Sequence, residues 1–353
     1  MLQSGPPKPI EIADPTLAEL GWQEFFSRQV STEDDRSCVP VRVMSVHRGM
    51  VSVLGAGLDA SVSSVLPVSG GPEDRPTVGD WLLIERQSLK PVRVLERSSL
   101  FKRPAPGDDQ RTQLIAANVD TLFVVTSCNE EFNVARIERY LVLAHEVGVR
   151  PVVVLTKADL AEDPDYFVQA SRALQSELAV ELINGRDRQS VGRLKDYCCL
   201  GETVALVGSS GVGKSTLINS LTGSDSIQTQ AVRESDGKGL HTTTVRQMHR
   251  LGAGSEGRGW LVDTPGMREL QMSEVASGVA EVFDDIVAVT LECRFTNCTH
   301  APEPGCAVRV AIGRGELALS RYERWRKLAD EDNVNTAIAS VRRARPVKGG
   351  RRK

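Results

Sequence analysis

One stretch of this chain has the residue types and the spacing of a phosphate-binding loop. In order along the chain, its residues are Gly208, Ser209, Ser210, Gly211, Val212, Gly213, Lys214, Ser215 and Thr216. Glycines allow the backbone to bend so that successive N–H groups converge on phosphate oxygens, and the amino end of a following helix favours an anion. Lys214 would act in catalysis by neutralising charge on the β- and γ-phosphates, and the Ser215 hydroxyl would ligate Mg²⁺. An apolar run before the loop and a helical pattern after it favour this interpretation over a glycine-rich turn without a ligand.

A second motif would complete the phosphate site. Asp263 and Gly266 have the spacing Asp-x-x-Gly at the end of the apolar run 260–262. Asp263 would hold Mg²⁺ through water, and the Gly266 N–H would touch the γ-phosphate. Between this motif and the loop lies the polar segment 237–244, in which Thr243 is the candidate for the Mg²⁺ shell. The pattern favours a switch loop that orders around the γ-phosphate, and a solvated loop is the alternative.

A third motif could read the base of the nucleotide. The apolar run 151–155 is followed by Thr156, Lys157, Ala158 and Asp159. A carboxylate at Asp159 can accept hydrogen bonds from N1–H and the exocyclic amine of guanine, which adenine does not offer in that arrangement. The stem of Lys157 can pack across the base. The motif therefore predicts GTP as the ligand, yet it precedes the phosphate loop, which reverses the order of an ordinary GTPase.

Metal-binding side chains gather near the C-terminal end, at Cys293, Cys298, His300 and Cys306. Three thiolates and one imidazole suit tetrahedral Zn²⁺, and four protein ligands leave no open position, so the predicted zinc is structural. Reduced cysteines in a core are the alternative. The other four cysteines are expected to be buried as small apolar residues. They are Cys38, Cys128, Cys198 and Cys199.

The periodicity of apolar residues predicts a multidomain α/β protein. Short alternating strands between Val39 and Glu96 suggest an OB-type β-barrel, used either to bind oligonucleotides or only for packing. From residue 118, apolar strands alternate with helical patterns, which predicts a mainly parallel sheet covered by helices. The pattern is helical from residue 271, with a charged helix around Glu316–Leu328. The expected parts are an N-terminal extension (1–36), the barrel (37–100), a GTPase domain (101–270), a helical zinc-binding domain (271–340) and a basic tail (341–353).

Composition narrows the class of protein further. The chain has 353 residues, of which 41% are hydrophobic and 25% charged, as is ordinary for a soluble globular protein. The net charge of −3 gives no global electrostatic case for nucleic acid, so any such contact depends on local clusters. The basic tail is one such cluster, and a disordered solubilising tail is the alternative interpretation of it. The sequence has no secretory signal pattern and no apolar run approaching the roughly 20 residues that span a bilayer. We therefore expect a cytoplasmic protein without membrane contact. We also expect the protein to be a monomer.

With its motifs in this order, the chain resembles the circularly permuted GTPases, and in detail the ribosome small-subunit-dependent GTPase family (RsgA/YjeQ). The matching stretches are 115–120, 156–160, 208–215, 239–244, 263–266 and the Cys/His cluster. The resemblance implies an OB barrel, a permuted GTPase domain and a zinc-binding domain, with GTP and GDP as ligands. It also implies binding to the small ribosomal subunit and its rRNA during late maturation, with GTP hydrolysis driving release. A GTP-regulated RNA or protein scaffold outside the ribosome is the alternative.

The chain departs from the usual motifs at several positions. Thr156 stands where Asn is commoner among GTPases, so the tie between the base reader and the phosphate loop is expected to be weaker. Leu240 stands where the family usually has a basic residue, which leaves any contact of that side chain with phosphate or RNA in doubt. A second base-contacting element would fall at Asn184 and Gly185.

Hydrolysis also needs a group that the usual position does not supply. Many GTPases have a Gln directly after the Asp-x-x-Gly motif that orients the attacking water, and here that position is Met267. A thioether cannot direct water through a strong hydrogen bond, so intrinsic hydrolysis is expected to be slow. His241 in the switch segment is the candidate catalytic residue, and we expect it to become ordered near the γ-phosphate only on the activating partner.

The motif order suggests how nucleotide state reaches the C-terminal domain. The chain leaves the expected GTPase domain at 263–266, the segment that would sense the γ-phosphate, and runs directly into the zinc-binding domain. We therefore expect the nucleotide to act on that domain through few residues. A flexible linker inserted after Leu270 is expected to preserve GTP binding and to uncouple it from ribosome affinity.

Overall fold

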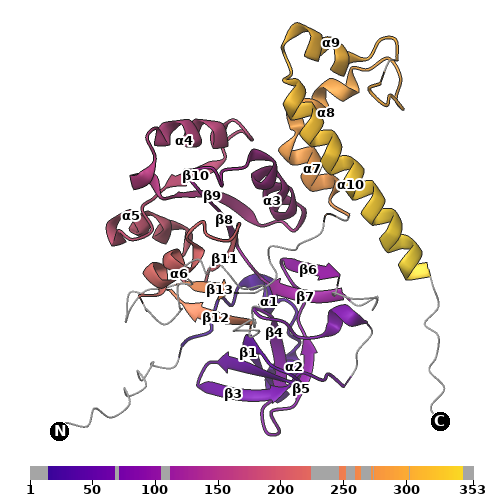
Figure 1. The fold of residues 1–353 in the computed structure, drawn as a ribbon. Helices are drawn as coiled ribbons and strands as arrows, with labels where there is room; N and C mark the ends of the chain where they lie inside the picture. The colour runs from indigo at the N-terminus through magenta and orange to yellow at the C-terminus, as the bar shows by residue number, and fades with distance from the viewer. Residues whose placement is uncertain are drawn as a thin grey trace, which may run out of the picture.

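The computed structural model describes residues 15–67, 71–104, 112–223, 246–251, 259–263, 272, 274–301 and 303–344. Its elements run from an N-terminal β region through a mainly parallel sheet to a helical C-terminal region (Figure 1). This order of regions confirms the fold expected from the sequence. The domain limits stay a prediction.

The N-terminal region is built from antiparallel strands in the order β3-β2-β1-β4-β5. The strands are β1 (Cys38–Val46), β2 (Met50–Gly55), β3 (Leu58–Ser63), β4 (Trp81–Glu85) and β5 (Pro91–Val94), preceded by the short helices α1 (Glu24–Ser27) and α2 (Thr32–Ser37). Inward-facing valines such as Val41, Val43 and Val51 form the core with Leu82 of β4. A five-stranded antiparallel arrangement is what an OB-type barrel requires. The sequence did not indicate β3, because Val62 is the only buried residue in its pattern.

The central region is a sheet in the order β10-β9-β8-β11-β13-β12. Its strands are β8 (Thr121–Ser127), β9 (Arg150–Thr156), β10 (Ala179–Leu182), β11 (Thr203–Val207), β12 (Arg246–Arg250) and β13 (Trp260–Asp263). All neighbouring pairs from β10 to β13 are parallel, and β12 is antiparallel to β13. The sheet that the sequence predicted is therefore confirmed, although it continues beyond β13 through the largely polar strand β12.

Helices cover both faces of this sheet, namely α3 (Val134–Glu146), α4 (Pro164–Arg172), α5 (Arg188–Gly192) and α6 (Lys214–Thr222). Alternate residues of β8 point to opposite faces, as strand geometry requires. Leu122 and Val124 share a core with α3, whereas Phe123 and Val125 share one with α6. Burial on both faces explains why the parallel strands have nearly continuous apolar sequences.

Strand β12 joins the central sheet to the N-terminal β region. It pairs with β13 on one side and with β1 on the other, where Gln247 lies opposite Ser45 and Arg246 opposite Val46. A separate hairpin of β6 (Leu100–Pro104) and β7 (Thr112–Ala117) follows the N-terminal region. The two β regions are therefore linked by main-chain hydrogen bonds as well as by side chains.

A buried arginine adds to this link. The guanidinium of Arg42 in β1 donates to Thr203 Oγ1 at 2.7 Å, to Asn118 O at 3.3 Å and to Leu20 O. Burial lowers the pKa of Arg42 to about 10, and the carboxylates of Asp120 and Asp80 oppose that shift. Acceptors from three separate segments thus compensate a cation that has almost no contact with water.

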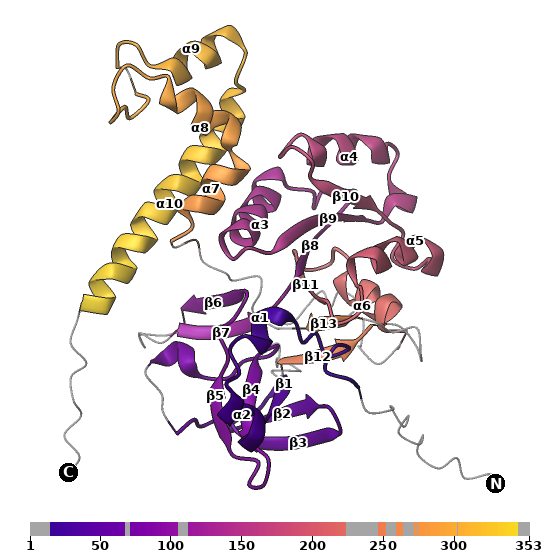
Figure 2. The same ribbon diagram turned by 180° about the vertical axis from the view of Figure 1, so that it is seen from behind.

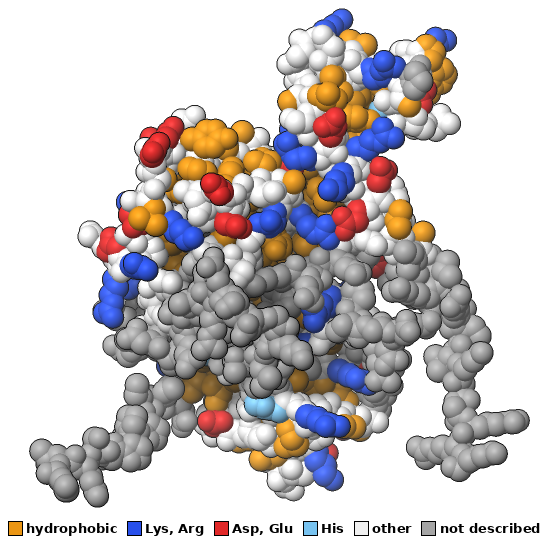
Figure 3. All heavy atoms as spheres, in the orientation of Figure 1, with side chains coloured by type: hydrophobic (Ala, Val, Ile, Leu, Met, Phe, Trp, Pro, Cys, Tyr) orange, Lys and Arg blue, Asp and Glu red, His pale blue; other side chains and the backbone are white. Residues whose placement is uncertain are grey.

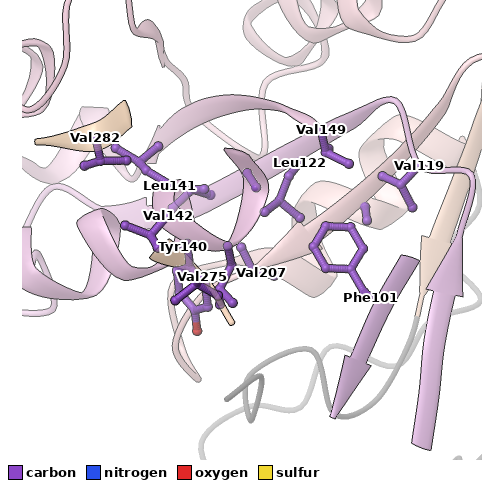
Figure 4. Close-up of a cluster of buried hydrophobic side chains, with 14 of the residues drawn as sticks. Phe101, Val119, Leu122, Tyr140, Leu141, Val142, Val149, Val207, Val275 and Val282 are labelled. Carbon is purple, nitrogen blue, oxygen red and sulfur yellow. The ribbon is translucent and has the colours of Figure 1, made fainter. Parts of the chain in front are cut away.

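The C-terminal region is helical, with α7 (Ala276–Val282), α8 (Asp284–Leu291), α9 (Ala307–Arg314) and α10 (Leu319–Ala344). The long helix α10 runs from the Cys/His segment past α7 (Figures 1 and 2). It extends well beyond the expected Glu316–Leu328 and includes the first residues of the expected basic tail. Figure 4 shows Val275 and Val282 packed with Tyr140, Leu141 and Val142 of α3, in one core with the sheet. Among the described residues, no helix combines the length and apolar character needed to cross a bilayer.

Candidate nucleotide site and Cys/His site

The predicted nucleotide motifs meet at one edge of the sheet. The phosphate loop follows β11, the base reader begins at the end of β9, and Asp263 ends β13. These strands are parallel, so their carboxyl ends lie on the same side, where α/β sheets bind ligands. Sheet pairing places β11 between β8 and β13. Folding thus brings together motifs that the chain carries in permuted order.

Two glycines give the phosphate loop its shape. Gly208 has φ 144°, and a Cβ there would lie 2.1 Å from the carbonyl oxygen of Val125 in β8. Gly213 has φ 95° and lies just before helix α6. A side chain at either position would strain the backbone. Ser215 and Thr216 consequently lie in the first turn of α6, where the N–H groups have no partner within the helix.

Lys214 reaches back across the phosphate loop. Its ammonium donates to the carbonyl oxygen of Gly208 at 2.9 Å and to that of Ser209. The cation therefore lies over the loop that is expected to surround the phosphates. Binding of phosphate would require these carbonyl contacts to be exchanged for phosphate oxygens.

Thr156 ties the base reader directly to the phosphate loop. Its buried hydroxyl lies 2.6 Å from the carbonyl oxygen of Val212 and 3.1 Å from that of Thr126. A hydroxyl has one proton to donate, and the shorter distance favours Val212 as its acceptor. In a trans peptide the carbonyl and the next N–H point in opposite directions, so this bond also orients the N–H of Gly213. Threonine stands here in place of the commoner Asn, and its hydroxyl still connects the base reader to the phosphate loop by a hydrogen bond.

The rest of the base reader is accessible. Lys157 has a left-handed backbone with φ 58°, which turns the chain sharply after β9. Asp159 lies in the following 3₁₀ turn and its side chain is exposed. Nearby, the carbonyl of Gly185 accepts from Ser220 Oγ on α6 at 2.8 Å, so the expected second base element lies beside the helix of the phosphate loop. Its contact with a base stays a prediction.

Asp263 is the candidate oxygen ligand beside the phosphate loop. Burial raises the pKa of Asp263, while His249 on β12 and Lys214 shift it the opposite way. The hydroxyl of Ser215 and this carboxylate are the hard oxygen donors that Mg²⁺ prefers, so the described residues fit the expected ion. His241, Thr243 and Gly266 lie outside the described residues, and their roles stay predictions.

One cation at the phosphate loop was not expected from the sequence. The guanidinium of Arg136, in the first turn of α3, donates to Ser209 Oγ. Asn133 caps this helix by accepting from the Arg136 N–H at 3.0 Å, which fixes where the helix begins. A start signal for α3 was therefore readable, but the contact of Arg136 with the loop depends on the pairing of β8 with β11.

The predicted metal ligands converge in the C-terminal region. The ligand atoms of Cys293, Cys298, His300 and Cys306 all lie within 4.8 Å of one another. His300 Nδ1 is 3.7 Å from Cys293 Sγ and 3.6 Å from Cys306 Sγ, so this nitrogen faces the thiols. Such a closed set of three thiols and one imidazole fits tetrahedral Zn²⁺.

The remaining cysteines were expected to be buried. Cys38, Cys128 and Cys198 are buried, which confirms the expectation for these three. Burial raises the pKa of Cys128 to about 11 and that of Cys198 to about 12, so both are thiols at neutral pH. Cys199 is exposed, and the expectation was wrong there because it lies in the turn before β11.

The fold and the site together define a circularly permuted P-loop GTPase that carries a C-terminal Cys₃His site. Residues 94–273 match the family described as RsgA GTPase. The chain is 46% identical over 347 residues to the small ribosomal subunit biogenesis GTPase RsgA of Mesorhizobium japonicum, with 98% of each chain covered. It is 44% identical to RsgA 2 of Vibrio parahaemolyticus, with 95% of this chain and 91% of the relative covered. This chain therefore belongs to the RsgA GTPase family.

Solved structures agree with this assignment. The crystal structure of YjeQ from Thermotoga maritima superposes with a TM-score of 0.58 at 25% identity and covers 88% of this chain and 100% of its own. YloQ, described as a circularly permuted GTPase, has the same TM-score at 21% identity and covers 88% of this chain and 97% of its own. The second likeness supports the fold alone.

Proposed function

We propose that this GTPase binds GTP with Mg²⁺ and hydrolyses it on the small ribosomal subunit during late maturation, with hydrolysis driving release. The observation that carries the nucleotide part is the 2.6 Å contact between Thr156 Oγ1 and Val212 O. It makes the base reader and the phosphate loop one site. The ribosomal part is supported by the Mesorhizobium and Vibrio relatives, which are described as small ribosomal subunit biogenesis GTPases.

Each end of the nucleotide has its own residues. Asp159 accepts hydrogen bonds from the guanine edge, and the stem of Lys157 packs along the ring. The loop N–H groups, including that of Gly213, surround the phosphates, and Lys214 exchanges its carbonyl acceptors for β- and γ-phosphate oxygens. The exposure of Asp159 supports this assignment, because its carboxylate is open to an arriving base.

When bound, Mg²⁺ would offset the negative charge that develops on the phosphates during phosphoryl transfer. Ser215 would hold the ion directly and Asp263 would hold it through water, with Thr243 added when the switch segment is ordered. The N–H of Gly266 would contact the γ-phosphate. The zinc held by the Cys₃His site would be structural and would stabilise the loop between α8 and α9.

His241 would orient the attacking water, since Met267 cannot. The activating partner would position His241 near the γ-phosphate, which makes slow intrinsic hydrolysis and strong stimulation the expected kinetic signature. We place the reaction in the cytoplasm, with the protein acting as a monomer. The basic tail would contact rRNA phosphates, and the affinity of this contact would fall as the salt concentration rises.

The decisive experiment measures steady-state GTP hydrolysis against increasing concentrations of purified small subunits, with large subunits as the matched control. We expect turnover to rise steeply with small subunits only. Equal turnover with both, together with retained GTP binding, would favour the GTP-regulated scaffold outside the ribosome instead.

A further inference from the structure

Helix α3 contacts the phosphate loop at its amino end. The guanidinium of Arg136 donates to Ser209 Oγ, and Lys214 holds the carbonyl oxygen of the same Ser209. Because Lys214 must leave that carbonyl to bind phosphate, nucleotide binding changes the part of the loop that Arg136 touches. A helix is a rigid element, so a change at its first turn can reach residues farther along it.

The next residues of α3 bind the C-terminal helix. Glu138 is fully buried and accepts from Arg324 Nε at 2.6 Å and from Arg321 Nη1 at 3.4 Å, both on α10. Arg139 forms two parallel hydrogen bonds of 2.7 Å with the carboxylate of Glu331. Bidentate pairs of this kind fix the relative orientation of two elements. Figure 3 shows charged side chains of both signs gathered where the central region meets α10.

The backbone of α7 also lies directly on α3. A Cβ at Gly278 would lie 2.2 Å from the carbonyl oxygen of Val142, so no larger residue fits there. The carboxylate of Glu146 accepts from Ser277 Oγ at 2.7 Å and from the Gly278 N–H at 3.1 Å. The C-terminal region is therefore attached along much of α3.

Another side of α10 contacts the Cys/His site. The rings of Tyr322 and Trp325 lie 6.5 Å and 5.8 Å from the imidazole of His300, measured between ring centroids. His300 also has a left-handed backbone, with φ 57°, so its position depends on surrounding contacts. The helix that binds α3 thus also positions a metal ligand.

We propose that α3 and α10 couple the phosphate loop to the Cys₃His site, with Arg136 as the positioning residue at the nucleotide end. The proposal rests on the proposed function, since it needs GTP at the loop and zinc at the cysteines. It differs from the route expected from the sequence, which runs through 263–266 directly into the zinc-binding domain. Every contact that carries the present proposal lies among the described residues. Linkage then requires nucleotide and zinc to change each other's affinity by the same factor.

The test uses the full chain loaded with Zn²⁺. Zinc affinity is measured by competition with a chromophoric chelator, without nucleotide, with GDP and with a non-hydrolysable GTP analogue. Binding of a fluorescent nucleotide is measured in parallel on the same samples. We expect nucleotide to change the zinc affinity about five-fold or more, as is typical of coupled sites.

Charge reversals then locate the route. Glu331→Arg should abolish the effect of nucleotide on zinc affinity. The double change Arg139→Glu with Glu331→Arg should restore this effect. Both side chains of this pair are about 30% exposed, at 29% and 31%, so these variants spare the core. Glu323→Arg, the same reversal at an exposed position of α10, is the matched control and should keep the effect. Arg136→Ala should weaken the effect, and Arg136→Lys should retain part of it.

Insertion of a flexible linker after Leu270, outside the described residues, separates the two routes. The proposal expects the nucleotide effect to survive this insertion. The proposal would be overturned if nucleotide no longer changed zinc affinity in the linker variant but still changed it in Glu331→Arg. Normal nucleotide binding with unchanged zinc affinity in the parent chain would overturn the coupling alone. Absence of nucleotide binding would overturn the proposed function and the coupling with it.

Discussion

The substitution Thr156→Val tests whether one hydroxyl holds the nucleotide site together. Valine keeps the shape of threonine and removes the donor to Val212 O, which lies 2.6 Å away. Thr156 and Val212 are both buried, at 2% and 1% exposure, so water cannot easily replace the lost partner. The change should therefore act on the loop rather than on packing.

The size of the effect follows from hydrogen-bond energetics. A net hydrogen bond contributes about 0.5–1.5 kcal/mol, and a buried carbonyl left unpaired costs about 1–3 kcal/mol. In the variant, the Val212–Gly213 peptide can relieve this cost by rotating, which turns the Gly213 N–H away from the phosphates. If restoring the productive orientation costs about 1.4 kcal/mol, nucleotide affinity falls about ten-fold.

Titration with a fluorescent GDP analogue measures this loss, and a thermal melt without nucleotide checks the fold. Thr156→Ser keeps the hydroxyl and Thr156→Asn supplies an amide donor, so both should stay close to the parent affinity. A Thr156→Val protein that binds GDP as tightly as the parent would refute the reasoning, because the loop would then be oriented without this bond.

Other residues of the two sites give independent predictions. Lys214→Ala should lower GDP affinity about 100-fold, since charged hydrogen bonds contribute about 1.5–3 kcal/mol each, and an unchanged titration curve would contradict the phosphate site. Ser215→Ala should reduce the difference in turnover between Mg²⁺ and chelator, and a parent-like Mg²⁺ dependence would oppose its role. His241→Ala should lower subunit-stimulated GTP hydrolysis by about 100-fold or more, the size expected for loss of general acid–base catalysis. Unchanged stimulated turnover would refute a catalytic role for His241. Cys306→Ser should reduce the zinc content measured by atomic absorption and increase proteolysis between α8 and α9. Stoichiometric zinc in this variant, or a parent protein without zinc, would argue against the zinc site.

Sequence reasoning succeeded where a signal is local. The parallel strands β8, β9 and β11 are apolar over most of their length, and this pattern predicted the central sheet. It failed for β12, whose pattern buries only Met248, because a polar strand shows its pairing only when its neighbours are in place. The length of α10 was also missed, since that helix continues as a charged sequence beyond Leu328.

The sequence alone determined which residues are candidates for the chemistry of this protein: the predicted phosphate loop and guanine reader in their permuted order, and the four candidate metal ligands. These depend on residue types at fixed spacing, so each can be read from a short segment. Only the tertiary structure decided that Thr156 binds the phosphate loop, that Arg136 reaches Ser209, and that Glu138 is buried between two arginines. A carboxylate such as Glu138 would ordinarily be expected in water. Its burial depends on packing between segments almost two hundred residues apart, which no local pattern encodes.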